Sequence, residues 1–296
     1  MYEQFKDLVR RFTFEHSNDE PDWTKLRILH AWGSKRENGI YSEITNAYGM
    51  EAKTFNYAKD VYGYKSAFKG VCDELLSATS NGPLPRPLYD VILIDEAQDL
   101  PESFFKLVYS VVENPKRIIW AYDDLQNLVD YTMLPPSDLF GIDDHQLPLI
   151  DLHNTEGQAR QDIVLPICYR NTPWALATAH ALGLGIYRKE GLVQFYDDFN
   201  LWKNIGYEVV SGDLAFGSNI SMRRSINSSP EFFKNVIDPS DAVNSTCFET
   251  ELEQAKWVAE NIQKNLTVDE VDEGVKGKKY RQSYCRGYYG QGLFIS

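Results

Sequence analysis

Between residues 91 and 122 the sequence carries the pattern of a strand, a helix and a second strand, which limits the fold more than any other stretch. Residues 91–94 (VILI) are all apolar and predict a strand buried on both faces, as in a parallel sheet. Pro101 suits the first turn of a helix. Five apolar residues at helical spacing would face inward from that helix: Phe104, Phe105, Val108, Val111 and Val112. Residues 117–122 (RIIWAY) predict the second strand, so we expect a right-handed α/β unit.

Three acids follow the first strand: Asp95, Glu96 and Asp99. Sites in open α/β sheets form outside the carboxyl ends of the strands. One acid at that edge can hold Mg²⁺ through its waters, and its neighbour can polarise a water for attack on a phosphate, as in the Walker B arrangement of nucleotide hydrolases. A structural interpretation stays open, because acids are also favourable at the N-terminus of the helix that Pro101 begins.

Composition and charge restrict the classes of protein to consider. The 296 residues are 43% apolar, which suffices for one large domain or two ordinary ones. No stretch approaches the run of about 20 apolar residues that a membrane helix needs, so no membrane partner is expected. The four cysteines include no C-x-x-C pair, which is typical of reduced thiols in a cytoplasmic protein. The net charge of −13 argues against a nucleic-acid binder that relies on charge alone, but not against a locally basic groove.

Four segments resemble motifs of the UvrD/Rep-like superfamily I DNA helicases, in the order that the family has them. The string LIDEAQDL (93–100) resembles motif II, in which an Asp-Glu-x-Gln-Asp core recurs. LRILHAWG (26–33) resembles the strand-and-His segment, motif Ib, ahead of an inserted subdomain. IWAYDDLQNL (119–128) is similar to motif III, and LPICYRNTPWAL (165–176) to motif IV. Two residues depart from the family, since Tyr122 replaces a glycine of motif III and Cys168 replaces an asparagine of motif IV.

The resemblance implies an ATP site with Mg²⁺ as the metal. Asp95 would hold the Mg²⁺ and Glu96 would activate the attacking water. Gln126 would sense the γ-phosphate, and Arg170 would place positive charge on it beside Tyr169. Structural alternatives stay open for two of these residues, because Gln126 could serve as a helix cap and Arg170 could form a surface ion pair.

The resemblance also implies DNA as a partner, either a single strand or a junction between duplex and single strand. His30 and Trp32 lie in the segment that touches single-stranded DNA in the family, and they could stack on a base. The alternative for both is a buried structural pair of aromatic side chains.

The fold class implied by the resemblance is α/β, with a RecA-like parallel sheet flanked by helices and part of a second RecA-like domain. Residues 1–172 would be the remainder of the first motor domain, with a small helical insertion near 35–80. Residues 173–273 would be a connecting helix and the start of the second motor domain. The basic, Gly- and Tyr-rich residues 274–296 show no apolar period and are expected to be disordered.

Outside the central unit, apolar patterns predict further elements. Helices are expected over residues 2–12, 68–76, 173–183, 229–237 and 251–266, and strands over 26–29, 162–170, 207–210 and 245–248.

The sequence contains no G-x-x-x-x-G-K-[ST] phosphate loop, whose backbone N–H groups and lysine would surround the phosphates. The nearest string, GVKGKKY (274–280), has the wrong spacing, and motifs V and VI are not recognisable. In the family the loop precedes the segment matching residue 1, so we expect an internal, truncated or degenerate piece with little ATP turnover. A non-catalytic interaction protein, with a partner of unknown identity, is the main alternative. A nuclease using Asp95, Glu96 and Asp99 as metal ligands is another.

Overall fold

The computed structural model describes residues 2–33, 37–80, 82, 86–123, 126, 133–185, 189, 200–213, 218–232, 243 and 245–267. The chain divides into two compact units, Met1–Ile163 and Val164–Ser296. The segment 165–176, which resembles motif IV, lies wholly in the second unit, whereas the first domain was expected to extend to residue 172. The expected tail at 274–296 lies outside the described residues.

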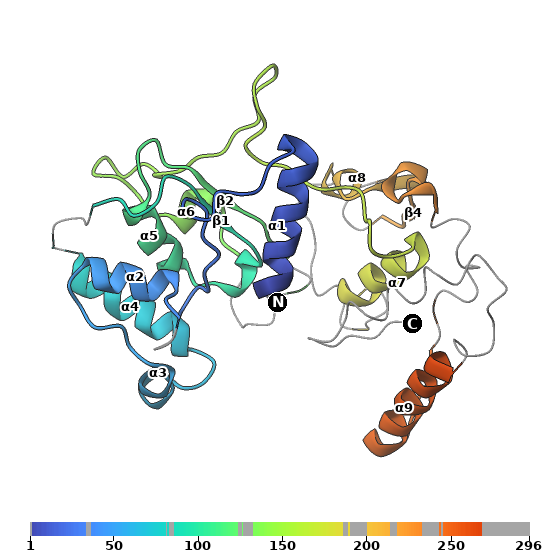
Figure 1. The fold of residues 1–296 in the computed structure, drawn as a ribbon. Coiled ribbons are helices and arrows are strands. Elements are labelled where there is room, and N and C mark those ends of the chain that lie inside the picture. Colours follow the sequence, from blue (N-terminus) through green and yellow to red (C-terminus); the bar gives the residue numbers. More distant parts are fainter. Residues whose placement is uncertain are drawn as a thin grey trace. The chain divides into compact units, whose positions relative to one another are not determined.

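Most of the regular structure described in the first unit is helical, with a short parallel sheet (Figure 1). Its elements are α1 (Tyr2–Ser17), α2 (Ile40–Ala47), α3 (Phe55–Tyr62), α4 (Ala67–Thr79), β1 (Ile92–Ile94), the 3-10 turn η1 (Ala97–Asp99), α5 (Glu102–Val111), β2 (Ile118–Trp120) and α6 (Pro136–Leu139). In the sheet, Ile92 lies opposite Ile118 and Ile94 opposite Trp120. The predicted strand, helix and strand are therefore confirmed, while a complete RecA-like sheet stays a prediction.

The core of the first unit forms where α2 and α4 pack against α5, and its buried cluster includes Ile92 and Ile94 on one face of β1. The residues expected to face inward at α5 are all at most 2% exposed: Phe104, Phe105, Val108, Val111 and Val112. They share one buried cluster with Leu75 of α4, Ile44 of α2, and Ile92 and Ile94 of β1. Burying a large apolar side chain stabilises a fold by about 1.5–3 kcal/mol, so this cluster is the main source of stability in the unit.

The opposite face of the sheet is exposed, and the prediction that residues 91–94 are buried on both faces is wrong. Ile92 and Ile94 are 7% and 9% exposed, but Leu93 between them is 70% exposed and Ile119 of β2 is 59% exposed. Successive side chains of a strand point to opposite faces, and among the described residues the core packs only on the face of Ile92 and Ile94. A continuous apolar run therefore forms a strand with one open face.

Residues 26–29 do not form the predicted strand. His30 makes an isolated bridge with Gly39, and its carbonyl accepts from the Ile40 N–H at 2.9 Å. The N-terminus of α2 thus supplies backbone partners for His30 and Ala31, which follow the predicted strand. The segment is fastened further by Arg27, which pairs with Glu43 of α2, and Glu43 also accepts from the Tyr89 hydroxyl.

Helix α1 confirms the first predicted helix and continues beyond it to Ser17. Three of the side chains that give it its apolar spacing are nonetheless exposed, by 42% at Phe5, 48% at Leu8 and 56% at Phe12. Helical periodicity therefore predicted the element correctly, but it did not predict burial.

The second unit combines helices with an antiparallel hairpin. Its described elements are α7 (Pro173–Gly183), α8 (Asn200–Asn204), β3 (Tyr207–Ser211), β4 (Ser221–Arg224), the 3-10 turn η3 (Ile226–Ser228) and α9 (Glu251–Thr267). The predictions of α7, β3 and α9 are confirmed, and β4 was not anticipated. No helix in the part of the chain that the structure describes is both long and apolar enough to cross a membrane.

The expected strands at 162–170 and 245–248 are absent from the described residues. In the first of them Leu165 is 82% exposed and Ile163 is 60% exposed, so this apolar run has neither a covering layer nor a pairing strand among those residues. Most of the helix predicted at 229–237 lies outside the described residues.

A cluster of polar side chains links α3 to α4 around Glu74. Its carboxylate accepts from the hydroxyls of Tyr57 at 3.1 Å and Tyr62 at 2.8 Å, and the Lys53 ammonium lies 3.4 Å away. Burial raises the pKa of Glu74, but these donors outweigh it and leave the pKa below its ordinary value. The hydrogen bond to Glu74 in turn raises the pKa of Tyr62 to about 12.

We expect truncation of a buried side chain to lower the free energy of unfolding far more than truncation of a side chain on the exposed face of the sheet. Phe105→Ala should lower the free energy of unfolding by about 3–5 kcal/mol, because it leaves a cavity in a fully buried cluster. Leu93→Ala, the control on the open face, should change it by less than about 0.5 kcal/mol. Urea denaturation followed by tryptophan fluorescence measures both, and equal losses for the two variants would contradict this description of the core.

The second prediction concerns pH. The pKa of Glu74 in the folded protein lies below its ordinary value of 4.5. Glu74 therefore stabilises the fold at pH values above 4.5, and this contribution is lost as the pH falls through the pKa of the folded protein. The stability difference between the wild type and Glu74→Gln should therefore shrink in that window. An NMR titration of the Glu74 carboxyl carbon should give a midpoint below 4.5, and a midpoint above it would argue against the Tyr57 and Tyr62 bonds.

Candidate functional site

The acids of the LIDEAQDL string lie at the carboxyl end of β1, where the sequence placed them. Asp95 and Glu96 follow the strand directly, and both are exposed. The hydrogen-bond ladder continues beyond the strands, because Ala121 N–H donates to the Ile94 carbonyl and Ala97 N–H donates to the Ala121 carbonyl, each at 2.9 Å. The segments that follow β1 and β2 are thereby brought together at one edge of the sheet.

Glu96 adopts a left-handed backbone conformation, with φ 52° and ψ 44°. This region costs an L-residue other than glycine about 1–2 kcal/mol, and such strain is common at functional sites. The conformation is stabilised locally, since the Asp95 carboxylate accepts from the Glu96 N–H at 3.1 Å. The turn places Ala97 and Gln98 inward, both at most 1% exposed, while the two acids stay in solvent.

A chain of hydrogen bonds connects Glu96 to Gln126. The Gln98 amide donates from Nε2 to Glu96 Oε2 at 2.7 Å and accepts at Oε1 from the Asp123 N–H at 3.1 Å. Gln126 Nε2 then donates to Asp123 Oδ2 at 2.7 Å. Two predicted site residues that lie 30 positions apart are therefore connected through Gln98 and Asp123.

Gln98 is the residue that the sequence analysis missed. It belongs to the Asp-Glu-x-Gln-Asp core that carries the resemblance, but no role was given to it. The available signal was its position, because a polar residue between strand-end acids and the apolar face of a helix must either be exposed or bond inward. The Asp123 that completes the connection lies three residues after the end of β2, whereas Asp95 follows β1 directly.

Tyr169 and Arg170 lie in the second unit, and both side chains are exposed. The segment before them is tied to the hairpin, since Arg224 donates to the Pro166 and Ser228 carbonyls, both at 3.2 Å, and Cys168 N–H donates to Ser228 at 3.1 Å. After Arg170, helix α7 begins as the sequence predicted, with Thr172 Oγ1 accepting from the Ala175 N–H at 3.2 Å. Convergence of Arg170 with Asp95 stays a prediction.

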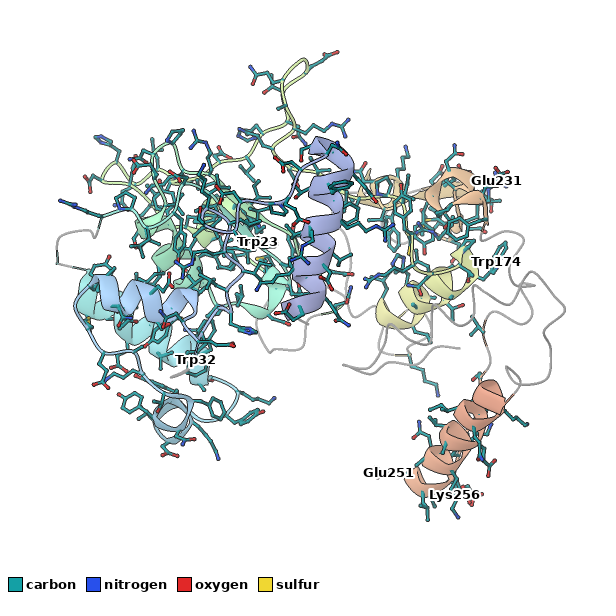
Figure 2. All side chains as sticks on the ribbon, viewed as in Figure 1. Trp23, Trp32, Trp174, Glu231, Glu251 and Lys256 are labelled. Atoms are coloured by element: carbon teal, nitrogen blue, oxygen red, sulfur yellow. The ribbon has the colours of Figure 1, made fainter. Side chains whose placement is uncertain are left out.

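The two residues expected to contact DNA differ in their surroundings. His30 is exposed. Trp32, labelled in Figure 2, is partly buried, and its indole N–H donates to the Lys53 carbonyl at 3.2 Å. Its ring lies 5.1 Å from Phe68 and 5.8 Å from Phe55, measured between centroids. These contacts favour the structural alternative for Trp32, while base stacking by His30 stays a prediction.

The donors at the strand end are those that Mg²⁺ prefers. Mg²⁺ is usually bound by one or two carboxylates and completes its shell with water and phosphate oxygens, and the exposed carboxylates of Asp95 and Glu96 fit that requirement. Among the described residues no three His, Cys, Asp or Glu side chains are grouped so that they could hold a metal ion together.

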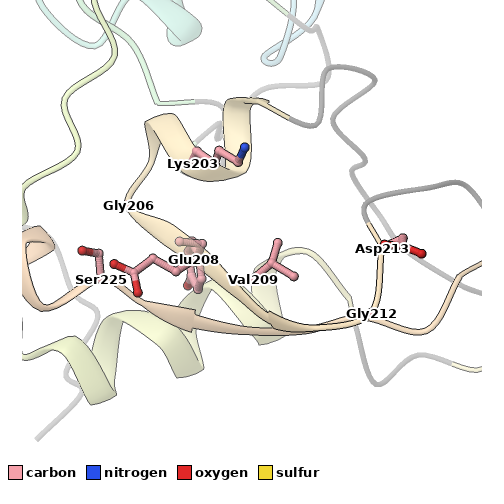
Figure 3. Close-up of a pocket in the computed structure, with 8 residues that line it drawn as sticks. Lys203, Gly206, Glu208, Val209, Gly212, Asp213 and Ser225 are labelled. Carbon is pink, nitrogen blue, oxygen red and sulfur yellow. The ribbon is translucent and has the colours of Figure 1, made fainter.

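A hollow of about 620 Å³ lies beside the hairpin of the second unit (Figure 3). Side chains of both charges line it, among them Lys203, Glu208 and Asp213. The pKa of Glu208 is lowered by hydrogen bonds from Ser225 and Arg223, which keeps its carboxylate ionised. None of the predicted site residues lines this hollow.

Comparison with known proteins gives no match to a family model, to a curated protein or to a solved structure.

Because the backbone at Glu96 is left-handed, we expect the glycine variant to be more stable than the alanine variant, the reverse of the usual order in a helix. Glu96→Gly should be more stable than Glu96→Ala by about 1 kcal/mol, because alanine keeps the strain and glycine does not. At Ser77, an exposed position inside α4, alanine should instead be more stable than glycine by about 1 kcal/mol. Urea denaturation of the four variants tests this, and the same order at both positions would rule out the left-handed conformation.

Proposed function

We propose that the chain carries part of an ATP-dependent DNA helicase motor of the UvrD/Rep-like type, in a cytoplasmic protein. The observation that carries the proposal is the hydrogen-bonded connection from Glu96 through Gln98 and Asp123 to Gln126. It supports a site at which a strand-end carboxylate and a glutamine from the segment after β2 act on one substrate. The ordered resemblance of four segments supplies the substrate class, which is a nucleoside triphosphate.

In this proposal each residue acts through the chemistry of its side chain. Asp95 holds the metal, and Mg²⁺ supplies charge neutralisation at the phosphates when it is bound. Glu96 accepts a proton from the attacking water. Gln126 donates a hydrogen bond to the terminal phosphate, and Arg170 of the second unit adds positive charge there, with Tyr169 beside it.

DNA is the proposed partner, as a single strand or at a junction with duplex. His30, which is exposed beside the N-terminus of α2, is the residue that we propose to stack on a base. With a net charge of −13 the chain would bind weakly, and the affinity would fall as salt rises.

A non-catalytic interaction protein is the second candidate, and one observation favours it. The sequence holds no phosphate-loop pattern, so no lysine and no backbone N–H cradle are identified for the phosphates. In this alternative the strand-end acids serve only the turn before α5, as negative charge near a helix N-terminus does.

Metal binding separates the two candidates. Mn²⁺ can stand in for Mg²⁺, and its free fraction is measured by electron paramagnetic resonance with ATP present. We expect weak binding by the wild type, a loss of roughly tenfold or more in Asp95→Asn because a charged ligand is removed, and no change in Asp90→Asn, an exposed acid before β1. Equal binding by the wild type and Asp95→Asn would exclude the metal site and favour the interaction protein.

ATP turnover is expected to be close to the uncatalysed background. Removing one oriented donor from a preorganised site lowers the rate by about 10²–10³, and a chain without the whole phosphate cradle should lose more. Phosphate release measured with and without single-stranded DNA checks this, with Glu96→Gln as the control that lacks the base. Strong DNA-stimulated turnover that Glu96→Gln abolishes would refute the expected inactivity, while supporting the assigned base.

A further inference from the structure

The side chain of Gln98 is buried and makes hydrogen bonds at both ends. It is 1% exposed, and it lies in the 3-10 turn between the strand-end acids and α5. An amide has one accepting end and one donating end. The Asp123 N–H can only donate, so it faces Oε1, and Nε2 then faces Glu96, whose ionised carboxylate can only accept. The two partners therefore require the same orientation of the amide.

This arrangement makes Gln98 sensitive to the position of the Glu96 carboxylate. If that carboxylate turned away, Nε2 would lose its partner in a buried environment, which is unfavourable for any polar group. The amide would have to reorient, and the Asp123 N–H would then lose its acceptor. Gln126 is bonded to the carboxylate of the same Asp123, so the disturbance would reach it as well.

The backbone connection between the two segments lacks this sensitivity. Ala97 and Ala121 are joined by a hydrogen bond between main-chain groups, and no part of the Glu96 side chain takes part in it. The backbone bond keeps the strand ends adjacent, whereas the side-chain bonds depend on where the Glu96 carboxylate lies.

We infer that Gln98 is a positioning residue that couples the Glu96 carboxylate to the segment carrying Gln126. Under the proposed function, on which this part of the inference rests, the coupling regulates the site: Gln126 is placed for the terminal phosphate only while Glu96 is in its bonded position. A change at Glu96, through a metal or a water, is transmitted to Gln126 by reorientation of one buried amide.

The test is amide hydrogen exchange by NMR on the full chain without nucleotide. The reporter is the Asp123 N–H, and the Ala121 N–H, which bonds to Ile94, reports any general loss of stability. Gln98→Met, which keeps the side-chain length, should raise the exchange rate of Asp123 roughly five- to tenfold, in keeping with the loss of one hydrogen bond, and leave Ala121 unchanged. Gln158→Met, at an exposed glutamine of the same unit, is the control and should change neither rate.

The coupling itself is tested with Glu96→Ala. In the wild type this change should accelerate exchange at Asp123, and in the Gln98→Met background it should add nothing. A space-filling role for Gln98 predicts instead the same response to Glu96→Ala in every background.

The outcomes separate this inference from the proposed function. Loss of Mn²⁺ binding in Asp95→Asn together with an unchanged Asp123 rate in Glu96→Ala would overturn the coupling alone. Intact coupling without Mn²⁺ or ATP binding would overturn the proposed function and leave the coupling as a structural property. Should Gln98→Met fail to fold, Glu96→Ala in the wild type still decides, because an unchanged Asp123 rate overturns the inference.

Discussion

The packing of α5 against α2 and α4, in a buried cluster that also takes in Ile92 and Ile94 of β1, is the contact on which the first unit depends. Ile92 and Ile94 point into the cluster that Phe105 and Val108 fill, and α2 and α4 complete it. Because a strand presents alternate residues to opposite faces, the same contact leaves Leu93 in solvent. The buried part of β1 ends at Ile94, and Asp95 and Glu96 follow it directly.

The candidate site follows from that geometry with few additional requirements. Parallel pairing of β1 with β2 brings the residues after both strands to one edge. The left-handed turn at Glu96 then separates exposed acids from a buried amide within four residues. Gln98 hydrogen-bonds to the residues that follow both strands, Glu96 after β1 and Asp123 after β2.

Local apolar patterns predicted which segments form helices and strands better than they predicted which side chains are buried. The residues of α5 face inward as predicted, since five apolar side chains at helical spacing leave one orientation that buries them all. The same kind of pattern in α1 predicted a helix but not the exposure of Phe5 and Phe12, because burial depends on what other segments cover. The acids were located because they follow a strand in sequence. The position of Gln98 could have indicated an inward hydrogen bond, but its partner could not be predicted, because Asp123 lies 25 residues away and becomes a neighbour only through the parallel pairing. The prediction of a strand at 162–170 was wrong for a related reason, since a strand needs a pairing partner that its own sequence does not specify.

The backbone strain at Glu96 affects which residue selection would keep at this position. Stability and the proposed chemistry favour different residues there, since glycine or asparagine would relieve the backbone, whereas neither can accept a proton from water as the proposed glutamate carboxylate would. A lineage under selection for folding alone would therefore lose the glutamate early, while Phe105 and Val108 would persist. Under the proposed function, residue 96 would therefore distinguish relatives that keep the proposed chemistry from relatives that keep only the fold.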